Sequence, residues 1–510
     1  MLQGRTLWEL IDARVDATPD ALMAVDEDMR TLTFAEFAIE SERAAAGLAD
    51  YGVTEGSVVS WQLPTWLESL VLVGALSRLG AVQNPILPIY REREVGFVTK
   101  QAATNLFIVP SQWRGFDFEA MATGVARDNG DTSVLVADKA LPQGDPNTLP
   151  PRTDLDIEAG DEPVRWLFYT SGTTADPKGA RHTDASIAAV AYGMAQRMAV
   201  NESGRSALVF PFTHIGGITW LFTALQSGCS LILMEAFHPT ETPEVLSRES
   251  VTLAGSGTPF HMAYLAAQRA SITTLFPDVR GFPGGGAPKP PQLVYDIRET
   301  FGAPVLSGYG LTEAPILTMA SITDTDDELA RSEGKPMPGV ELKLVTIEGK
   351  LAGHGEEGEV RAKAPQIMKG YLDSSLDADA FDDEGYFRTG DLGRLDDEGN
   401  LIITGRLKDI IIRKGENISA KEVEDMLYRH PKVGDVAVIG LPDPASGERA
   451  CAVVATKDGE DDLTLDEMID FLKNEGLMVQ KLPEQLEIVA AVPRNPSGKI
   501  LKHVLREQFS

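Results

Sequence analysis

The stretch YTSGTTADPKGA at residues 169–180 combines hydroxyl side chains, glycines and one lysine in a short span. Backbone N–H groups in glycine-rich turns form concave anion sites, and hydroxyl groups add further donors. The spacing is not that of a Walker-type loop, because Lys178 precedes Gly179 and Ala180 follows. The stretch therefore predicts a phosphate-binding loop of another kind, although clusters of Ser, Thr and Gly are also typical of polar surface loops.

Four further stretches follow in order along the chain. They are GYGLTE at 308–313, YFRTGD at 386–391, GRLKDIIIRKGENIS at 405–419 and PRNPSGKILK at 493–502. Together with the first loop, they resemble the motifs of the adenylate-forming superfamily, which includes acyl-CoA synthetases, firefly luciferase and the adenylation domains of peptide synthetases. The resemblance covers the whole chain. It implies a large N-terminal domain of three subdomains and a small mobile C-terminal domain, with the active site between them.

The resemblance also implies how ATP is bound. The β- and γ-phosphates would be held by Thr170, Ser171, Gly172, Thr173, Thr174 and Lys178. The adenine base would lie against Gly286, Ala287, Pro288 and Tyr309, and the ribose hydroxyls would be bound by Asp391 and Arg406. The chain departs from the usual motif at Ala175, where the family has a glycine. Because alanine restricts the backbone more than glycine does, we expect a less flexible loop.

The implied reaction has two steps, in which a carboxylate first forms an acyl-adenylate with ATP and a thiol then displaces AMP. Lys499 and Thr312 would act on the α-phosphate, and Glu313 would bind Mg²⁺, a cation that prefers oxygen ligands. The small domain would pivot at Lys408 between the two steps. The thiol would be that of coenzyme A. Loading of a free-standing carrier protein and a non-catalytic role in binding a nucleotide or acyl ligand are the alternatives.

Two features favour coenzyme A as the acceptor and an apolar acid as the substrate. We expect no carrier domain after Ser510, and no large insertion separates Glu313 from Tyr386. His214 would border the carboxylate, and no Asp near it offers a partner for an ammonium group. The acyl pocket implied by the resemblance comprises Ile215, Gly216, Phe260, Gly284, Gly310 and Leu311, with Gly216 and Gly217 leaving room. A medium-chain, alicyclic, aromatic or steroid side-chain acid would fit such a pocket.

The pattern of elements predicts an α/β fold with layered, largely parallel sheets. Strands are expected at VRWLFYT (164–170), SALVF, SLILM and PVLSGY, and a helix is expected from Asp184. After Tyr386 the composition changes to that of a small α+β domain. It begins with a hairpin around DEGN and has capping boxes at Ser419/Glu422 and Thr464/Glu467. We place the domain boundary near Arg406–Asp409, which divides the chain into residues 1–407 and 408–510.

Composition limits the range of partners. The net charge of -30 over 510 residues disfavours nucleic acid and anionic lipid as partners, although a local basic cluster can still bind small anions. Cys229 and Cys451 are expected to be buried thiols in a reducing compartment. The N-terminus predicts an amphipathic helix rather than a signal peptide, and no stretch is long and apolar enough to span a membrane. We therefore expect a cytoplasmic protein, and the sequence leaves a homodimer open.

Overall fold

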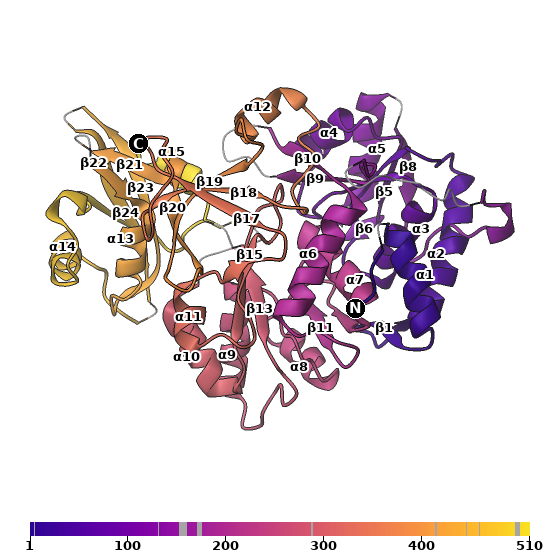
Figure 1. Cartoon of the computed structure of the whole chain (residues 1–510), viewed down its shortest axis with the longest axis horizontal. Helices are drawn as coiled ribbons and strands as arrows, with labels where there is room; N and C mark the ends of the chain where they lie inside the picture. Colours follow the sequence, from indigo (N-terminus) through magenta and orange to yellow (C-terminus); the bar gives the residue numbers. More distant parts are fainter. Residues whose placement is uncertain are drawn as a thin grey trace.

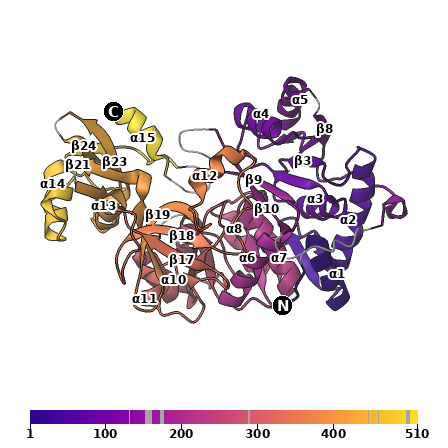
Figure 2. The same cartoon turned by 45° about the horizontal axis from the view of Figure 1, so that its top comes forward.

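The computed structural model shows a large body and a small C-terminal body, which is coloured yellow in Figure 1 and is also separate in the turned view of Figure 2. The structure describes residues 1–4, 6–130, 132–151, 161–170, 176–286, 289–413, 416–444, 446–457, 459–494 and 500–510. The fold is of the mixed α/β class that the sequence predicts.

A six-stranded sheet supplies the strand that precedes the phosphate loop. Its order is β10 (Lys178–His182), β9 (Trp166–Thr170), β4 (Val82–Pro85), β3 (Val58–Trp61), β5 (Leu106–Val109) and β8 (Ser133–Val136). All neighbouring strands are parallel except β10, which runs antiparallel to β9 and pairs Lys178 with Thr170. The segment predicted to bind phosphate therefore connects two paired antiparallel strands, and the strand expected at 164–170 is confirmed as β9. The short strands β6 (Gln112–Trp113) and β7 (Phe116–Asp117) form a separate pair.

Two four-stranded sheets form the rest of the layered core. One has the order β11 (Arg205–Leu208), β12 (Ser230–Leu233), β1 (Leu22–Asp26) and β2 (Thr31–Thr33). The other has the order β13 (Phe282–Gly285), β14 (Val305–Tyr309), β15 (Thr318–Met319) and β16 (Lys335–Pro336). Leu253 forms parallel bridges to Ser206 on one side and Gly281 on the other, so it lies between the two sheets. The strands expected at SALVF, SLILM and PVLSGY are confirmed as β11, β12 and β14.

Helices surround these sheets, and α6 packs against α7 in the middle of the large body (Figure 1). The predicted helix start is confirmed, because α6 begins at Asp184 after the capping residue Thr183. The bounds in the first half of the body are α1 (Leu7–Ala17), α2 (Phe34–Ala49), α3 (Leu67–Arg78), α4 (Glu92–Gln101), α5 (Phe118–Asn129), η1 (Pro146–Thr148), α6 (Asp184–Arg197) and α7 (Ile215–Ser227). Those that follow are α8 (Glu241–Arg248), α9 (Thr258–Ala270), α10 (Pro291–Phe301), α11 (Asp326–Arg331), η2 (Ser374–Leu376) and α12 (Asp377–Ala380).

An antiparallel sheet leads from the large body towards the small one. Its order is β17 (Glu341–Val345), β18 (Gly358–Lys363), β19 (Phe387–Leu395) and β20 (Leu401–Arg406). The hairpin expected around DEGN is confirmed as β19–β20. The short helix η3 (Leu407–Asp409) follows β20 directly.

The small body has its own sheet and its own core. The sheet has the order β22 (Glu416–Ser419), β21 (Ile410–Arg413), β24 (Gly447–Thr456) and β23 (Val433–Asp443), and β25 (Gln485–Ile488) pairs with β24. Its helical segments are α13 (Ala420–Leu427), α14 (Leu465–Asn474), η4 (Val479–Lys481) and α15 (Lys502–Phe509). Alternate residues of β23 face opposite clusters, with Val436 and Val438 in one and Ala437 and Ile439 in the other. Both faces of the sheet are therefore buried, as period-two alternation allows.

Two expectations about buried and membrane-spanning segments can be compared with the structure. Cys229 and Cys451 are both buried and unbridged, as predicted. Within the described residues, no helix has the length and apolarity needed to cross a bilayer. Helix α3 is an apolar core element, and its residues Leu70, Leu72 and Val73 are fully buried.

Candidate active site

Three residues predicted to bind the nucleoside come from three different strands and lie in contact. The Tyr309 hydroxyl donates to Asp391 Oδ2 at 2.8 Å, and Arg406 Nε lies 2.7 Å from Asp391 Oδ1. Asp391 and Arg406 are directly opposite each other in the β19–β20 pair, and Tyr309 ends β14. Burial and the charge of Asp391 both raise the pKa of Tyr309 well above its ordinary value. The phenol therefore stays neutral and the carboxylate, although almost fully buried, has a cation beside it.

The predicted metal ligand Glu313 is held by a segment about 55 residues further along. Its Oε1 accepts a hydrogen bond of 2.8 Å from the Tyr371 hydroxyl, and its carbonyl accepts one of 2.9 Å from Met368 N–H. Among the described contacts, none engages the second carboxylate oxygen, Oε2. Burial and the nearby charge of Glu313 raise the pKa of Tyr371, so its phenol remains a donor. No cluster of three or more His, Cys, Asp or Glu side chains suited to a metal ion occurs within the described part of the chain.

The backbone at Thr312 is fixed by a buried histidine. His182 Nε2 lies 2.9 Å from the Thr312 carbonyl oxygen, and Nδ1 lies 3.1 Å from Ser186 Oγ. Because a carbonyl can only accept, Nε2 carries the proton and donates. Burial lowers the pKa of His182 to about 4, so the ring is neutral at neutral pH. His182 therefore positions the start of the loop that carries Thr312 and Glu313.

The structure describes only the two ends of the segment predicted to bind phosphate. Thr170 ends β9 and Lys178 begins β10, and the Lys178 ammonium lies 5.3 Å from the centroid of the Tyr371 ring. The other residues predicted for this loop, Ser171, Gly172, Thr173, Thr174 and Ala175, lie outside the described residues. The same is true of Ala287 and Pro288 in the adenine segment and of the predicted catalytic residue, Lys499. Gly286 is described, and it adopts a φ of 77° that favours glycine.

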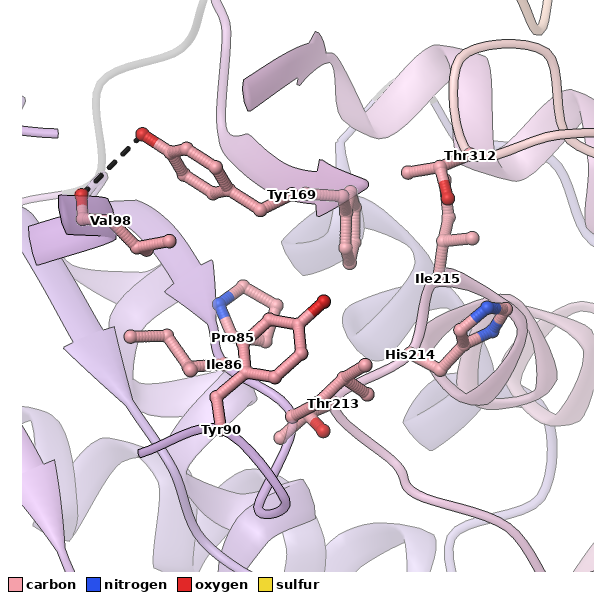
Figure 3. A pocket seen from close by; sticks show the side chains of 11 residues that line it. Pro85, Ile86, Tyr90, Val98, Tyr169, Thr213, His214, Ile215 and Thr312 are labelled. Carbon is pink, nitrogen blue, oxygen red and sulfur yellow. Dashed lines mark hydrogen bonds between the residues drawn. The ribbon is translucent and has the colours of Figure 1, made fainter. Parts of the chain in front are cut away.

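A cavity lies beside His214, between the six-stranded sheet and the start of α7 (Figure 3). It encloses about 350 Å³ of empty space, part of it open to solvent, and is lined by Pro85, Ile86, Leu87, Tyr90, Val98, Phe168, Tyr169, Thr213, His214, Ile215 and Thr312. Within this described lining there is no Asp, Glu, Lys or Arg. The Tyr169 hydroxyl donates to the Val98 carbonyl at 3.4 Å, so its ring forms part of the cavity wall. The cavity is therefore suited to an uncharged, apolar group.

The imidazole of His214 stands at this cavity as the capping residue of α7. Its Nδ1 accepts a hydrogen bond of 3.1 Å from Gly216 N–H, so this nitrogen carries no proton. In the neutral ring the proton is then on Nε2, the nitrogen that remains available to a ligand. The ring is exposed to solvent and lies beside Thr213 and Ile215, as Figure 3 shows.

Most residues of the predicted acyl pocket lie elsewhere, since only Ile215 of the six lines this cavity. A Cβ on Gly310 would come within 2.1 Å of Ile316 N, and one on Gly284 would be 3.0 Å from Gly257 N. Leu311 N–H donates to the Ala314 carbonyl within its loop. Phe260 packs edge-on against Phe237, with their ring centroids 4.8 Å apart. The role of these residues stays a prediction.

The room expected at Gly217 is absent, because a Cβ there would approach the Phe212 carbonyl oxygen to 2.6 Å. A Cβ on Gly216 would meet His214 Nδ1 at 3.2 Å. These glycines allow the start of α7 to pack closely on the preceding turn. The expectation that they leave space for a substrate was therefore wrong for Gly217.

Tyr371 and His182 were missed by the sequence reasoning. A signal for His182 was available, since residues 178, 180 and 182 share one face of a strand, and Lys178 had already been assigned to the site. No comparable signal existed for Tyr371. It meets Glu313 only because the segment before α12 folds back onto β10, where Tyr371 bridges Ala180.

Two buried histidines predict a dependence of stability on pH. Burial lowers the pKa of both His182 and His261 to about 4, whereas an unfolded histidine has a pKa of about 6.5. Between these values the unfolded chain binds more protons, so stability falls as the pH is lowered through this window. From pH 7 to pH 5 we expect a loss of about 2 kcal/mol per histidine in the free energy of unfolding.

The measurement is urea unfolding of the chain at a series of pH values above 5, where most carboxylates remain ionised. His261→Gln keeps a donor for the Pro283 carbonyl, which His261 Nε2 contacts at 2.9 Å, but cannot titrate. It should remove the share of the slope that His261 contributes. An unchanged slope would contradict the assignment.

Comparisons with known proteins agree with the geometry. Residues 11–372 match the family model "AMP-binding enzyme", and residues 422–499 match "AMP-binding enzyme C-terminal domain". The medium-chain fatty-acid–CoA ligase of Escherichia coli is 32% identical over 97% of this chain and 88% of its own. The salicyl-AMP ligase/salicyl-S-ArCP synthetase of Mycobacterium tuberculosis is 31% identical over 99% and 91%. The ATP-bound structure of MatB from Rhodopseudomonas palustris superposes with a TM-score of 0.87, at 26% identity over 98% of both chains.

The chain belongs to the AMP-binding enzyme family and is an adenylate-forming enzyme. Within that family it is an acyl-CoA ligase that uses ATP and small-molecule substrates. The expected fold class, with a large N-terminal domain and a small C-terminal domain, is thereby confirmed. The exact boundary and the roles of individual residues stay predictions.

Proposed function

We propose that this ligase joins an apolar carboxylic acid to coenzyme A in two steps at one site. First, a carboxylate oxygen bonds to the α-phosphorus of ATP, and the bond from that phosphorus to the pyrophosphate oxygen breaks. Then the thiol sulfur of coenzyme A bonds to the acyl carbon, the bond to AMP breaks, and the thiol proton is lost. The observation that carries this proposal is that Asp391 contacts both Arg406 and Tyr309. Tyr309 precedes Thr312 by three residues.

These contacts suggest how the nucleoside is bound. Asp391 is the acceptor for the ribose hydroxyls, and Arg406 pairs with the buried carboxylate and orients it. The ring of Tyr309 lies against adenine, together with the segment of Gly286, Ala287 and Pro288. Thr312 contacts the α-phosphate through its hydroxyl, which can donate to a phosphate oxygen. Its carbonyl accepts from His182, which fixes the backbone at this residue. Lys178 and the residues between it and Thr170 bind the leaving phosphates.

Mg²⁺ enters with ATP as part of the substrate, and it neutralises charge on the phosphate oxygens. Glu313 fits a hard cation, since one carboxylate oxygen is occupied by Tyr371 and the other has no hydrogen bond among the described contacts. Lys499 is proposed to place its ammonium beside the charge that develops between carboxylate and α-phosphate. A neutral His214, with its proton on Nε2, can donate to the substrate carboxylate.

The aromatic cavity beside His214 supports an apolar acyl group. Without charged side chains in its described lining, it would bind a second carboxylate or an ammonium group poorly. The named substrates of the relatives cited above, a medium-chain fatty acid and salicylate, are both carboxylic acids with an apolar body. The second of those names also includes a carrier protein, so carrier loading remains the alternative for the second step.

A panel of acids tests this proposal. Purified protein with ATP and Mg²⁺ should release pyrophosphate with medium-chain or aromatic acids and much more slowly with amino acids or dicarboxylates. Adding coenzyme A should give acyl-CoA and AMP. Release of pyrophosphate with thioester formed only on an added carrier protein would favour the alternative. Failure to release pyrophosphate with every acid would overturn the function.

A second experiment tests the cavity as the acyl site. Ile215 begins α7 and lines the cavity, so Ile215→Ala should lower kcat/KM for the best acid about tenfold and improve it for bulkier acids. Ile218→Ala is the matched control, because Ile218 is on the same helix and fully buried but does not line the cavity. It should lower stability with no change in acid preference. Equal preferences in both variants would exclude this cavity.

We also propose that residues 1–407 form the domain that binds ATP and the acid, and that residues 408–510 form the domain that moves. The short helix η3 lies between the last strand of one and the first strand of the other. We propose the cytoplasm as the site of action, where coenzyme A and ATP are both available.

A further inference from the structure

Tyr371 lies between two oppositely charged residues of the proposed site. Its hydroxyl donates to Glu313 Oε1 at 2.8 Å, and the Lys178 ammonium lies 5.3 Å from the centroid of its ring. Tyr371 is only 4% exposed and Glu313 is also buried, so their hydrogen bond is shielded from water, whereas Lys178 is half-buried. Among the described residues there is no ion pair between Lys178 and Glu313.

The backbone of Tyr371 is fixed from several directions. Tyr371 pairs with Ala180 in an antiparallel bridge, and Leu372 N–H donates to the Gly179 carbonyl at 2.8 Å. Tyr371 N–H itself donates to Asp377 Oδ1 at 2.7 Å. The ring therefore has a defined position relative to β10, the strand that begins with Lys178.

Each of these contacts has a consequence for charge. A hydrogen bond to one carboxylate oxygen restricts rotation of the group, which directs the other oxygen to a fixed place. A cation over an aromatic face is attracted by the ring quadrupole without losing its charge. If the ring were absent, the ammonium and the carboxylate could pair directly in a poorly solvated site, and each would lose strength towards phosphate or metal.

We propose that Tyr371 is a positioning residue that orients Glu313 towards the Mg²⁺ of bound ATP and keeps Lys178 apart from it. This inference rests on the proposed function, in which Glu313 meets the metal and Lys178 meets the phosphates. In this proposal Tyr371 acts through Glu313 and Lys178. Its hydroxyl contacts the Glu313 carboxylate and its ring contacts the Lys178 ammonium. One substitution can therefore remove the hydroxyl alone, and another can remove the hydroxyl and the ring together.

Tyr371→Phe removes only the hydroxyl, and Tyr371→Leu removes the ring as well. The direct readout is the affinity of Mn²⁺ for the protein with a non-hydrolysable ATP analogue, measured by electron paramagnetic resonance. We expect Tyr371→Phe to weaken Mn²⁺ binding five- to tenfold and to raise the Mg²⁺ concentration for half-maximal adenylation by a similar factor. Tyr371→Leu should in addition weaken binding of the nucleotide several-fold.

Tyr386 offers a matched control outside the proposed site. Its hydroxyl donates to Glu341 at 3.2 Å, and the Lys343 ammonium lies 4.2 Å from its ring centroid. Tyr386→Phe therefore removes the same kind of contact, and we expect Mn²⁺ affinity within twofold of the unchanged protein. Thermal unfolding of all variants identifies any general loss of structure.

A double variant separates positioning from mere structural support. In a Glu313→Gln background, Tyr371→Phe should have little further effect on Mn²⁺ binding, because its target is already altered. Independent losses that multiply would overturn the inference, as would unchanged Mn²⁺ affinity in Tyr371→Phe. Failure of the unchanged protein to bind the Mn²⁺–nucleotide complex would instead overturn the proposed function, and the inference with it.

Discussion

Lys408→Pro is expected to leave acyl-adenylate formation nearly intact and to slow thioester formation by on the order of 100-fold. Lys408 is the middle residue of the short helix η3, where a φ of about -60° is normal, so the ring of proline matches the local conformation. A pivot must leave that conformation when the domains rotate. Proline would fix one pose and so prevent the second step.

Ion pairs on the two sides of Lys408 support a pivot at this position. On one side, Arg406 lies 2.7 Å from Asp391 in the large domain. On the other side, Asp409 lies 2.9 Å from Arg506 on α15 of the small domain. The neighbours of Lys408 are thus attached to different bodies, which are visibly separate in Figure 2. Single positions of this kind often absorb the backbone rotation in hinged proteins.

The measurement is single-turnover kinetics of each half-reaction on the same preparation. Lys408→Ala removes the same side chain without restricting φ, so it should support both steps at near-normal rates. Proline at Lys408 also restricts Leu407, and a variant that unfolds would lose both steps alike. Equal losses in a folded variant, or a normal overall rate, would contradict the hinge.

Asp391→Ala is expected to lower kcat/KM for ATP by about 10²–10³-fold. The substitution removes the proposed ribose acceptor and leaves Arg406 and the Tyr309 hydroxyl without their partner. Breaking one side of a fully buried ion pair costs about 3–5 kcal/mol, and the cost here is smaller because the remaining Arg406 side chain is partly exposed. Asp391→Asn, which keeps the shape and an acceptor, should lose less.

Asp382 provides a control for the loss of a buried carboxylate as such. It is paired with Lys343 at 2.9 Å and with Arg361 at 3.1 Å, and hydrogen bonds from these partners lower its pKa despite its burial. Asp382→Asn should lower the unfolding temperature but leave the KM for ATP within about twofold, as expected for a site that binds no ligand. If both variants lost stability and kept their affinity for ATP, Asp391 would be a structural residue only.

Local patterns predicted the local structure well. The apolar run before the phosphate loop predicted β9, and DEGN predicted the β19–β20 hairpin. The capping box at Thr464 and Glu467 forms both of its hydrogen bonds. At Ser419 only half of the box forms, because the Glu422 carboxylate instead pairs with Lys481 at 2.6 Å. Lys481, which is 59 residues away in the sequence, therefore determines which contact the Glu422 carboxylate makes.

Only those site residues that belong to a recognisable sequence motif were predicted. Glu313 and Asp391 belong to recognisable stretches, whereas the tyrosine that orients Glu313 and the histidine that holds Thr312 are brought in by tertiary folding. Small residues are ambiguous for the same reason. A glycine can leave space for a ligand or allow two backbones to touch, and only the position of Phe212 shows that Gly217 does the second.

Because the two cysteines are buried, their rates of chemical modification can report local opening of the structure. Cys229 lies in the core of the large domain and Cys451 in that of the small one. Burial raises the pKa of Cys229 to about 11 and that of Cys451 to about 12, so neither thiol supplies appreciable thiolate to exchange with coenzyme A disulfides. Modification by a thiol reagent therefore requires local opening. With one cysteine in each core, the rates at the two positions report how often each domain opens.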